Sequence, residues 1–159
     1  MIELADKYLM QTGRRLPVTF VRGRGCLLYD DAGREYLDMV AGIAVNLLGH
    51  SHPDVVAALT RQAGQLIHTS NLYFTQPQVE LAKRLVELSF PSRAFFCNSG
   101  AEANEAAIKL ARRARPQGKV VVLQGAFHGR TYGALSATPQ ESKQAPFAPL
   151  VPGFEVISK

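Results

Sequence analysis

The chain has 159 residues, of which 47% are hydrophobic, and it carries a formal charge of +5. This composition excludes a wholly disordered protein, and the length allows one sizeable hydrophobic core. No apolar run approaches the ~20 residues of a membrane-spanning helix, and residues 1–7 lack a signal-peptide core, so we expect a cytoplasmic protein with no membrane partner.

The positive charge does not favour a nucleic acid as the partner. The local cluster of basic residues at 109–119 falls where a helix is expected to end, and the helix dipole favours cations there. Aromatic side chains that would stack on bases do not alternate with these cations. We therefore expect no nucleic-acid partner.

Neither the cysteines nor the histidines predict a metal site. Cys26 and Cys97 lie far apart in apolar, strand-like runs, so we expect buried free thiols. His50 and His52 are separated by one residue, but no third ligand of suitable spacing accompanies them. The sequence predicts no bound metal.

The first fifty residues predict a short helix and three short strands. Apolar residues at helical spacing between positions 4 and 9 predict a helix that ends near Gly13. Short runs separated by glycine-containing turns predict strands at residues 18–23, 26–30 and 34–38. Residues 39–49 are apolar and rich in small side chains, which indicates a buried loop.

Two helices are predicted next, with an aromatic loop between them. Residues 53–67 have a proline near the start and an apolar stripe typical of a core-facing helix. A second helix follows a capping box at residues 75–78 and ends before Pro91. Residues 68–74 between them have the composition of a site-lining loop, but taken alone they favour an ordinary helix connection.

An apolar strand at residues 94–97 is predicted to turn directly into a helix through Ser99, Gly100 and Ala101. Unpaired N–H groups at a helix start attract an anion such as phosphate, a serine hydroxyl adds a donor, and glycine and alanine leave room for it. The same residues fit a capping box, in which Ser99 caps the amide of Glu102 and Glu102 bonds the amide of Ser99. Taken alone, the pattern favours the ordinary strand-to-helix connection over an anion site.

Residues 119–124 form an apolar β-branched run, which is typical of a strand buried in a parallel sheet. The segment from 94 to 124 therefore predicts a βαβ unit with a right-handed crossover. Ligands of such sheets bind at the carboxyl ends of the strands, so the loop at 125–131 and the start of the helix should be neighbours. After Gly133, four prolines predict a loop, and residues 154–157 predict another strand.

Two side chains of this second loop suit a ligand with a flat ring and a carboxylate. Phe127 can stack on the ring, and Arg130 can bind the carboxylate in a bidentate manner. Core packing of Phe127 and a solvated charge at Arg130 stay open as alternatives. A phosphate at the first loop beside these groups at the second favours a site for a phosphorylated ring and an anionic substrate.

At these residues the sequence resembles the class III pyridoxal-phosphate-dependent aminotransferases, most closely those of the acetylornithine type. The resemblance covers nearly the whole chain, with its motifs in the family's order, at residues 15–18, 40–46, 49–53, 69–73, 96–105 and 127–131. It implies an α/β fold in which a small N-terminal α+β region, residues 1–50, is followed by the start of a large domain of the fold type I transferases. Residues 51–159 would form the first part of this mostly parallel sheet, truncated.

The resemblance also assigns roles to the two loops. It implies that Ser99, Gly100 and Ala101 bind the phosphate of pyridoxal 5′-phosphate. Phe127 would cover the pyridine ring, and Arg130 would bind the substrate carboxylate.

The implied reaction transfers the terminal amino group of N-acetylornithine to 2-oxoglutarate, in arginine biosynthesis. The partners would be small amino-acid and 2-oxo-acid substrates, and the full-length family member would be a homodimer. Ornithine, succinyl-diaminopimelate or 4-aminobutyrate as the amino donor, or a non-catalytic phosphate-binding remnant, stay open. Family members are much longer and their Schiff-base lysine lies later, so we expect an N-terminal fragment with no catalytic residue of its own, inactive alone.

Overall fold

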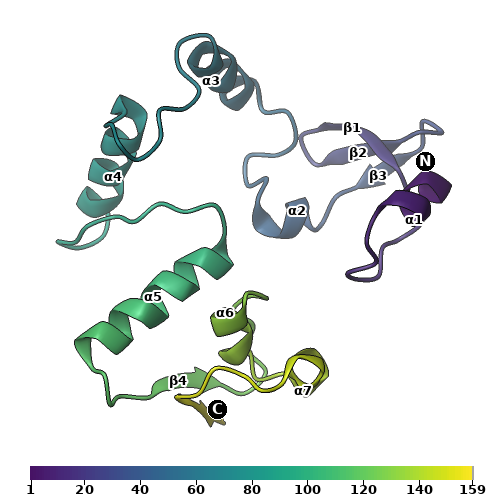
Figure 1. Ribbon diagram of the computed structural model, residues 1–159. Helices are drawn as coiled ribbons and strands as arrows, with labels where there is room; N and C mark the ends of the chain where they lie inside the picture. Colours follow the sequence, from purple (N-terminus) through teal and green to yellow (C-terminus); the bar gives the residue numbers. More distant parts are fainter. Residues whose placement is uncertain (159) are drawn as a thin grey trace. The chain divides into compact units, whose positions relative to one another are not determined.

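The computed structural model describes residues 1–158, which form two compact units (Figure 1). The first unit comprises Met1–Phe74, and the second begins at Thr75. Within the described residues, no helix combines the length and the apolar character needed to cross a membrane. The expected domain division after residue 50 concerns the complete fold and stays a prediction.

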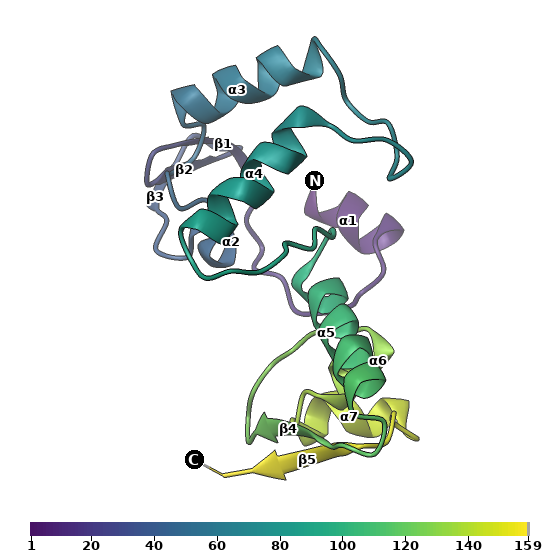
Figure 2. The ribbon, with the colours of Figure 1, turned by 90° about the vertical axis from the view of Figure 1, so that its left-hand side faces the viewer.

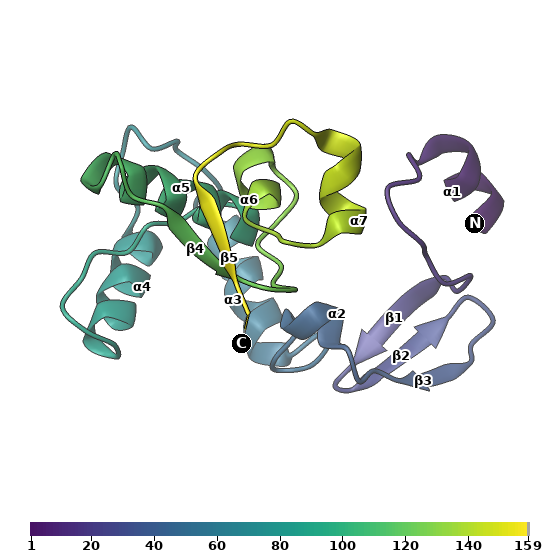
Figure 3. The same ribbon diagram turned by 90° about the horizontal axis from the view of Figure 1, so that it is seen from below.

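The first unit is built on an antiparallel sheet of three strands, β1 (Phe20–Arg24), β2 (Leu27–Asp30) and β3 (Glu35–Leu37), which pair in this order (Figure 3). These strands confirm the sequence prediction to within two residues. The predicted N-terminal helix also forms, as α1 (Ile2–Tyr8), but it ends well before Gly13 because the backbone of Leu9 is already extended.

Asp30 ties together the turn between β2 and β3. The residue is 2% exposed, and one carboxylate oxygen accepts hydrogen bonds from the amides of Ala32, at 3.0 Å, and Arg34, at 2.8 Å. The other oxygen accepts from Arg34 Nε at 2.6 Å and from the Tyr36 hydroxyl at 3.0 Å. Burial by itself raises the pKa of Asp30, but the bonds from Arg34 and Tyr36 outweigh it and lower the pKa below its ordinary value.

The segment after β3 is not the buried loop that its composition predicts. It contains α2 (Ala41–Ala44), in which all four residues have positive φ, between 51° and 64°. The left-handed conformation costs a non-glycine residue about 1 kcal/mol or more, so contacts outside the turn must hold it. The apolar side chains of this segment are exposed, and Ile43 is 86% exposed.

Asp38 and His50 hold the two ends of that segment. One oxygen of Asp38 accepts hydrogen bonds from the amides of Val40 and Ala41, both at 2.9 Å, and the other lies 2.6 Å from Nε2 of His50. The backbone of His50 also exchanges two hydrogen bonds with Gly25. The hydrogen bond to His50 is the largest cause that lowers the pKa of the Asp38 carboxyl.

The predicted helix after His52 is α3 (Pro53–Ala63), four residues shorter than expected. His52 acts as its cap, because Nδ1 accepts a hydrogen bond from the amide of Asp54 at 3.3 Å. The apolar stripe of α3 is largely exposed, with Leu59 at 66%, which contradicts its assignment to a core. A helical spacing of apolar residues predicts an apolar face on the helix, but it does not show which other element packs against that face.

The second unit begins with α4 (Gln76–Glu87), which confirms a predicted helix, although Thr75 makes no side-chain capping bond and the capping box at 75–78 is wrong. α5 (Gly100–Ala114) follows, then β4 (Val120–Leu123), and finally β5 (Phe154–Ile157). β4 and β5 pair in parallel, with Val120 opposite Phe154 (Figure 3). Both strands are confirmed.

Between these two strands lie three short helices instead of the predicted loop. They are α6 (Tyr132–Ser136), α7 (Glu141–Gln144) and the 3-10 helix η1 (Ala145–Phe147). The prolines lie outside the helix interiors or in a first turn, where the missing N–H has no intrahelical partner to lose. The prolines therefore lie at or between the helices of this segment and do not prevent these helices from forming.

Residues 94–97 do not form the strand predicted before α5. A strand requires hydrogen bonds to a neighbouring strand, and among the described residues β4 pairs only with β5. Phe95 is 69% exposed, and Cys97 and Cys26 are exposed free thiols, which contradicts the expected burial of both cysteines. The βαβ unit is thus present only as its helix and second strand.

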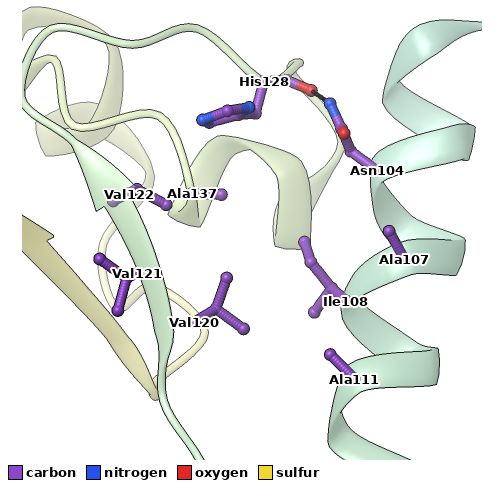
Figure 4. A pocket seen from close by; sticks show the side chains of 9 residues that line it. All are labelled: Asn104, Ala107, Ile108, Ala111, Val120, Val121, Val122, His128 and Ala137. Atoms are coloured by element: carbon purple, nitrogen blue, oxygen red, sulfur yellow. Dashed lines mark hydrogen bonds between the residues drawn. The ribbon is translucent and has the colours of Figure 1, made fainter.

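A small core joins α5 to the parallel pair. Ile108, Val122 and Ala137 are buried, and Val120 and Phe154 pack against them. Figure 2 shows α5 beside α6, and Figure 4 shows Ile108 directed from α5 toward β4. This core fixes the part of α5 that lies beyond its first turn.

We predict that Asp30→Asn lowers the melting temperature of the chain by several degrees, because an amide cannot accept all four hydrogen bonds that the carboxylate accepts. The pKa of Asp30 is lowered in the folded state, so its stabilisation is present above about pH 4 and is lost as the pH falls through that lowered value. Thermal unfolding followed by circular dichroism at several pH values measures both effects. Asp31→Asn, at the exposed neighbour, is the control. Equal melting temperatures for the two variants would contradict the prediction.

Candidate functional site

The N-terminus of α5 is capped from both sides. Ser99 is the N-cap, and its hydroxyl oxygen accepts a hydrogen bond from the amide of Glu102 at 3.2 Å, as the capping box predicts. The carboxylate of Glu102 accepts from the amide of Asn98 at 2.5 Å, and not from that of Ser99. The extended backbone at Ser99 presents the preceding amide to Glu102, so the second half of the predicted box is shifted by one residue.

Two amides in the first turn of α5 stay open. Within the part of the chain that the structure describes, the N–H groups of Gly100 and Ala101 have no hydrogen-bond acceptor. A Cβ atom added at Gly100 would meet no atom within 4 Å, so the surroundings of this residue are open on that side. Open donors at the positive end of a helix dipole suit an anion such as phosphate.

The loop after β4 lies against this helix start, as predicted. Gly129 has a φ of +136°, and a Cβ atom there would lie 2.8 Å from Cβ of Ala101 and 2.9 Å from Cβ of Ala134. Only glycine fits both the conformation and the space. The two predicted loops are therefore in direct contact.

Side chains from the surrounding helices hold the backbone of this loop. Asn104 of α5 donates to the carbonyl oxygen of His128 at 2.6 Å (Figure 4). Thr138, which is completely buried, accepts from the amide of His128 at 2.9 Å, and Gln140 donates to the carbonyls of Gly125 and Ala126 at 3.1 Å. The loop is thus tied to α5 and to the segment after α6 along most of its length.

Glu105 of α5 holds the end of the loop. Its Oε1 accepts hydrogen bonds from the hydroxyl of Thr131 at 2.6 Å and from the amide of Ala134 at 3.0 Å. The bond from Thr131 is the largest cause that lowers the pKa of the Glu105 carboxyl, and it outweighs the opposing effect of burial. Glu105 is therefore an ionised cap on the first turn of α6.

The five residues that the sequence singles out fall in this region. Ser99, Gly100 and Ala101 form the start of α5, and Ala101 contacts the loop that carries Phe127 and Arg130. Phe127 is 56% exposed, so its ring is not part of a core in this structure. Arg130 is exposed as well.

The sequence reasoning missed the residues that hold the loop in place. Asn104 carried a detectable signal, because it lies three residues after Ala101 and four before Ile108, on the face of α5 that turns inward. A polar residue on such a face needs a partner. Thr138 and Gln140 carried no such signal, since both lie in the segment after Gly133 that was expected to be a loop.

A cavity of about 250 Å³ lies between α5 and β4, next to the loop (Figure 4). Its lining is mostly apolar, with Ile108, Val120 and Val122 among its walls, and Asn104 and His128 are its only polar residues. Such a lining does not suit an anion, so the cavity is separate from the open amides of α5.

Comparisons of the sequence and the structure with known proteins both match this chain to part of the aminotransferases. The family model described as aminotransferase class-III matches residues 8–159. The chain is 54% identical to the acetylornithine aminotransferase of Methanocaldococcus jannaschii, over 98% of this chain and 41% of that protein.

Two solved structures illustrate the structural similarity. The N-acetylornithine aminotransferase of Stenotrophomonas maltophilia is 39% identical, with a TM-score of 0.76 over 99% of this chain and 38% of its own. The taurine:2-oxoglutarate aminotransferase of Bifidobacterium kashiwanohense, solved with pyridoxal phosphate and glutamate, is 31% identical, with a TM-score of 0.91 over 98% of this chain and 36% of its own. The chain thus spans about two fifths of the length of the proteins it matches.

We predict that Gly129→Ala destabilises the chain by more than about 1 kcal/mol, because the new methyl group meets Ala101 and the backbone conformation is unfavourable for alanine. Urea unfolding followed by circular dichroism measures the change in the free energy of unfolding. Gly13→Ala is the matched control, since a Cβ atom there meets nothing within 4 Å and its φ is not in the left-handed region. A loss no larger than that of the control would show that the two loops are not in contact.

Proposed function

Since this chain belongs to the class-III aminotransferases, we propose that the start of α5 and the loop after β4 bind pyridoxal 5′-phosphate and a carboxylate substrate for amino transfer. The single observation that carries the proposal is the pair of open amides at Gly100 and Ala101, placed directly beside the loop through Gly129. This arrangement supports an anion site and a ring-binding residue within one compact unit.

The residues present fit the phosphate of this cofactor. Gly100 and Ala101 offer two backbone N–H donors, and the hydroxyl of Ser99 keeps its own proton to donate, since its oxygen is the acceptor in the bond from Glu102. A phosphate accepts several such bonds at once, and the helix dipole favours its negative charge. The carboxylate of Glu102 is already engaged with Asn98, which directs it back along the chain.

The second loop supplies the remaining contacts. The exposed ring of Phe127 would cover one face of the pyridine ring, and the guanidinium of Arg130 would bind the substrate carboxylate through two parallel hydrogen bonds. When bound, the cofactor acts as the electron sink for the transfer of an amino group. The role of this chain's residues in that reaction is to bind and orient the cofactor and the substrate.

The amino donor that we propose is N-acetylornithine, with 2-oxoglutarate as acceptor, in arginine biosynthesis. The 54% identity to a protein named acetylornithine aminotransferase supports this choice of donor. The neighbour solved with glutamate and named for 2-oxoglutarate supports the acceptor. By family resemblance, we further propose that the complete enzyme is a homodimer.

We predict that the chain binds pyridoxamine 5′-phosphate and that Ser99→Ala weakens this binding by about tenfold or more, because one hydrogen bond to a charged phosphate is lost. Isothermal titration calorimetry measures the affinity, and this amine form of the cofactor does not couple covalently to lysines. Ser92→Ala is the control, since the hydroxyl of Ser92 donates only to the carbonyl of Phe90. Equal affinities for the two variants would remove Ser99 from the phosphate site.

We also predict that the isolated chain transfers no amino group from N-acetylornithine to 2-oxoglutarate, even with saturating cofactor. In the family, a lysine bonded to the cofactor is the general base, and none of the six lysines of this chain stands in its sequence context. A coupled assay for glutamate formation tests this expectation. Turnover above the rate of free cofactor would overturn it.

A further inference from the structure

Two successive turns of α5 contribute to the candidate site in different ways. The first turn, at Ser99–Ala101, holds the open amides, and the second turn carries Asn104 and Glu105, which bond the loop after β4. One rigid helix therefore connects the proposed phosphate site to the loop that carries the proposed ring-binding and carboxylate-binding residues. The distance between the two halves of the site depends on how that loop is attached to α5.

Glu105 makes the contact that fixes the far end of the loop. It bonds the side chain of Thr131 and the amide of Ala134, and it lies so close to Gly133 that a Cβ atom there would be 2.4 Å from Oε2. The carboxylate thus engages the loop and the first turn of α6 together. A glycine at position 133 is what allows this close approach.

Apart from the contact of Gly129 with Ala101 and Ala134, apolar packing does not hold the loop in this position. The buried cluster of Ile108, Val122 and Ala137 lies further along α5, and Phe127 is 56% exposed. The loop is attached instead by hydrogen bonds that Asn104 and Gln140 donate and that Glu105 and Thr138 accept. Of these four, Glu105 alone is charged and therefore makes the strongest bonds.

We propose that Glu105 is a positioning residue, which holds the loop of residues 125–131 at a fixed place relative to the N-terminus of α5 and thereby sets Phe127 and Arg130 against the phosphate site. The effect on ligand binding rests on the proposed function, whereas the attachment of the loop to α5 can be measured without any ligand. Glu105 touches neither the phosphate site nor the side chains of Phe127 and Arg130 in the contacts above. Its effect on cofactor binding is therefore indirect.

Hydrogen exchange tests the attachment in the 159-residue chain without ligand. Glu105→Gln keeps the shape of the side chain but removes its charge, so the amides between residues 125 and 136 should exchange about tenfold faster. The amides of α5 between residues 103 and 113 should keep their rates. Glu87→Gln is the matched control, because the Glu87 carboxylate is exposed and pairs only with Lys83, at 3.7 Å. Unchanged exchange in the loop, or equal acceleration in α5, would overturn the proposal.

Two ligands then separate positioning from a general loss of structure. For Glu105→Gln we expect about tenfold weaker binding of pyridoxamine 5′-phosphate, which needs both loops, and inorganic phosphate affinity within about twofold of the parent chain. Equal losses for both ligands would overturn the positioning role. If the parent chain binds neither ligand, the proposed function fails, whereas the hydrogen-exchange result still decides the attachment.

Two variants of Thr131, the residue that bonds Glu105, test the same contact even if the Glu105→Gln chain does not fold. Thr131→Val removes the hydroxyl that bonds Glu105, and Thr131→Ser keeps it. We expect fast loop exchange and weak pyridoxamine 5′-phosphate binding for the valine variant, and rescue of both by serine. Identical behaviour of the two variants would overturn the proposal independently of the Glu105 result.

Discussion

The candidate site depends on the close approach of Gly129 to Ala101, the second residue of α5. Because no side chain fits between them, the loop after β4 can lie directly against the first turn of the helix. The open amides of that turn and the loop that carries Phe127 and Arg130 then lie next to each other. A bulkier residue at position 129 would separate them, whatever the rest of the sequence.

Polar side chains, and not a large core, fix this geometry. The buried apolar residues of the second unit form a small cluster around Ile108, whereas the loop is held by bonds from α5 and from the segment after α6 to its backbone. Hydrogen bonds are directional, so they define the position of a loop more narrowly than apolar contact does. The proposed site would bind a ring and a phosphate at once, and such definition would suit that task.

The first unit uses the same principle at its turns. Asp30 gathers four donors in the turn between β2 and β3, and Asp38 joins two amides and His50 across the left-handed segment. The apolar face of α3 is meanwhile largely exposed. The chain spans about two fifths of the length of the proteins it matches, and local polar bonds keep its turns in shape without a large buried surface.

The sequence by itself determined the features that depend on neighbouring residues. Apolar periodicity located α1, α3 and α4, short apolar runs and glycine turns located β1 to β3, and Ser99 marked the start of α5, because these patterns act over a few residues. The ordered family motifs indicated the region of the site. The sequence also predicted that the two loops are neighbours, which the contact of Gly129 with Ala101 confirms, although the strand at residues 94–97 on which that prediction rested does not form.

Only the tertiary structure decided burial and partners. The sequence could not show that residues 94–97 lack a neighbouring strand, that both cysteines are exposed, or that Glu102 bonds Asn98. It also could not show that Glu105 reaches residues 131–134, because the partners of a side chain across 26 or more positions depend on how the elements pack. Local patterns specify which surface an element offers, and the three-dimensional arrangement specifies what meets it.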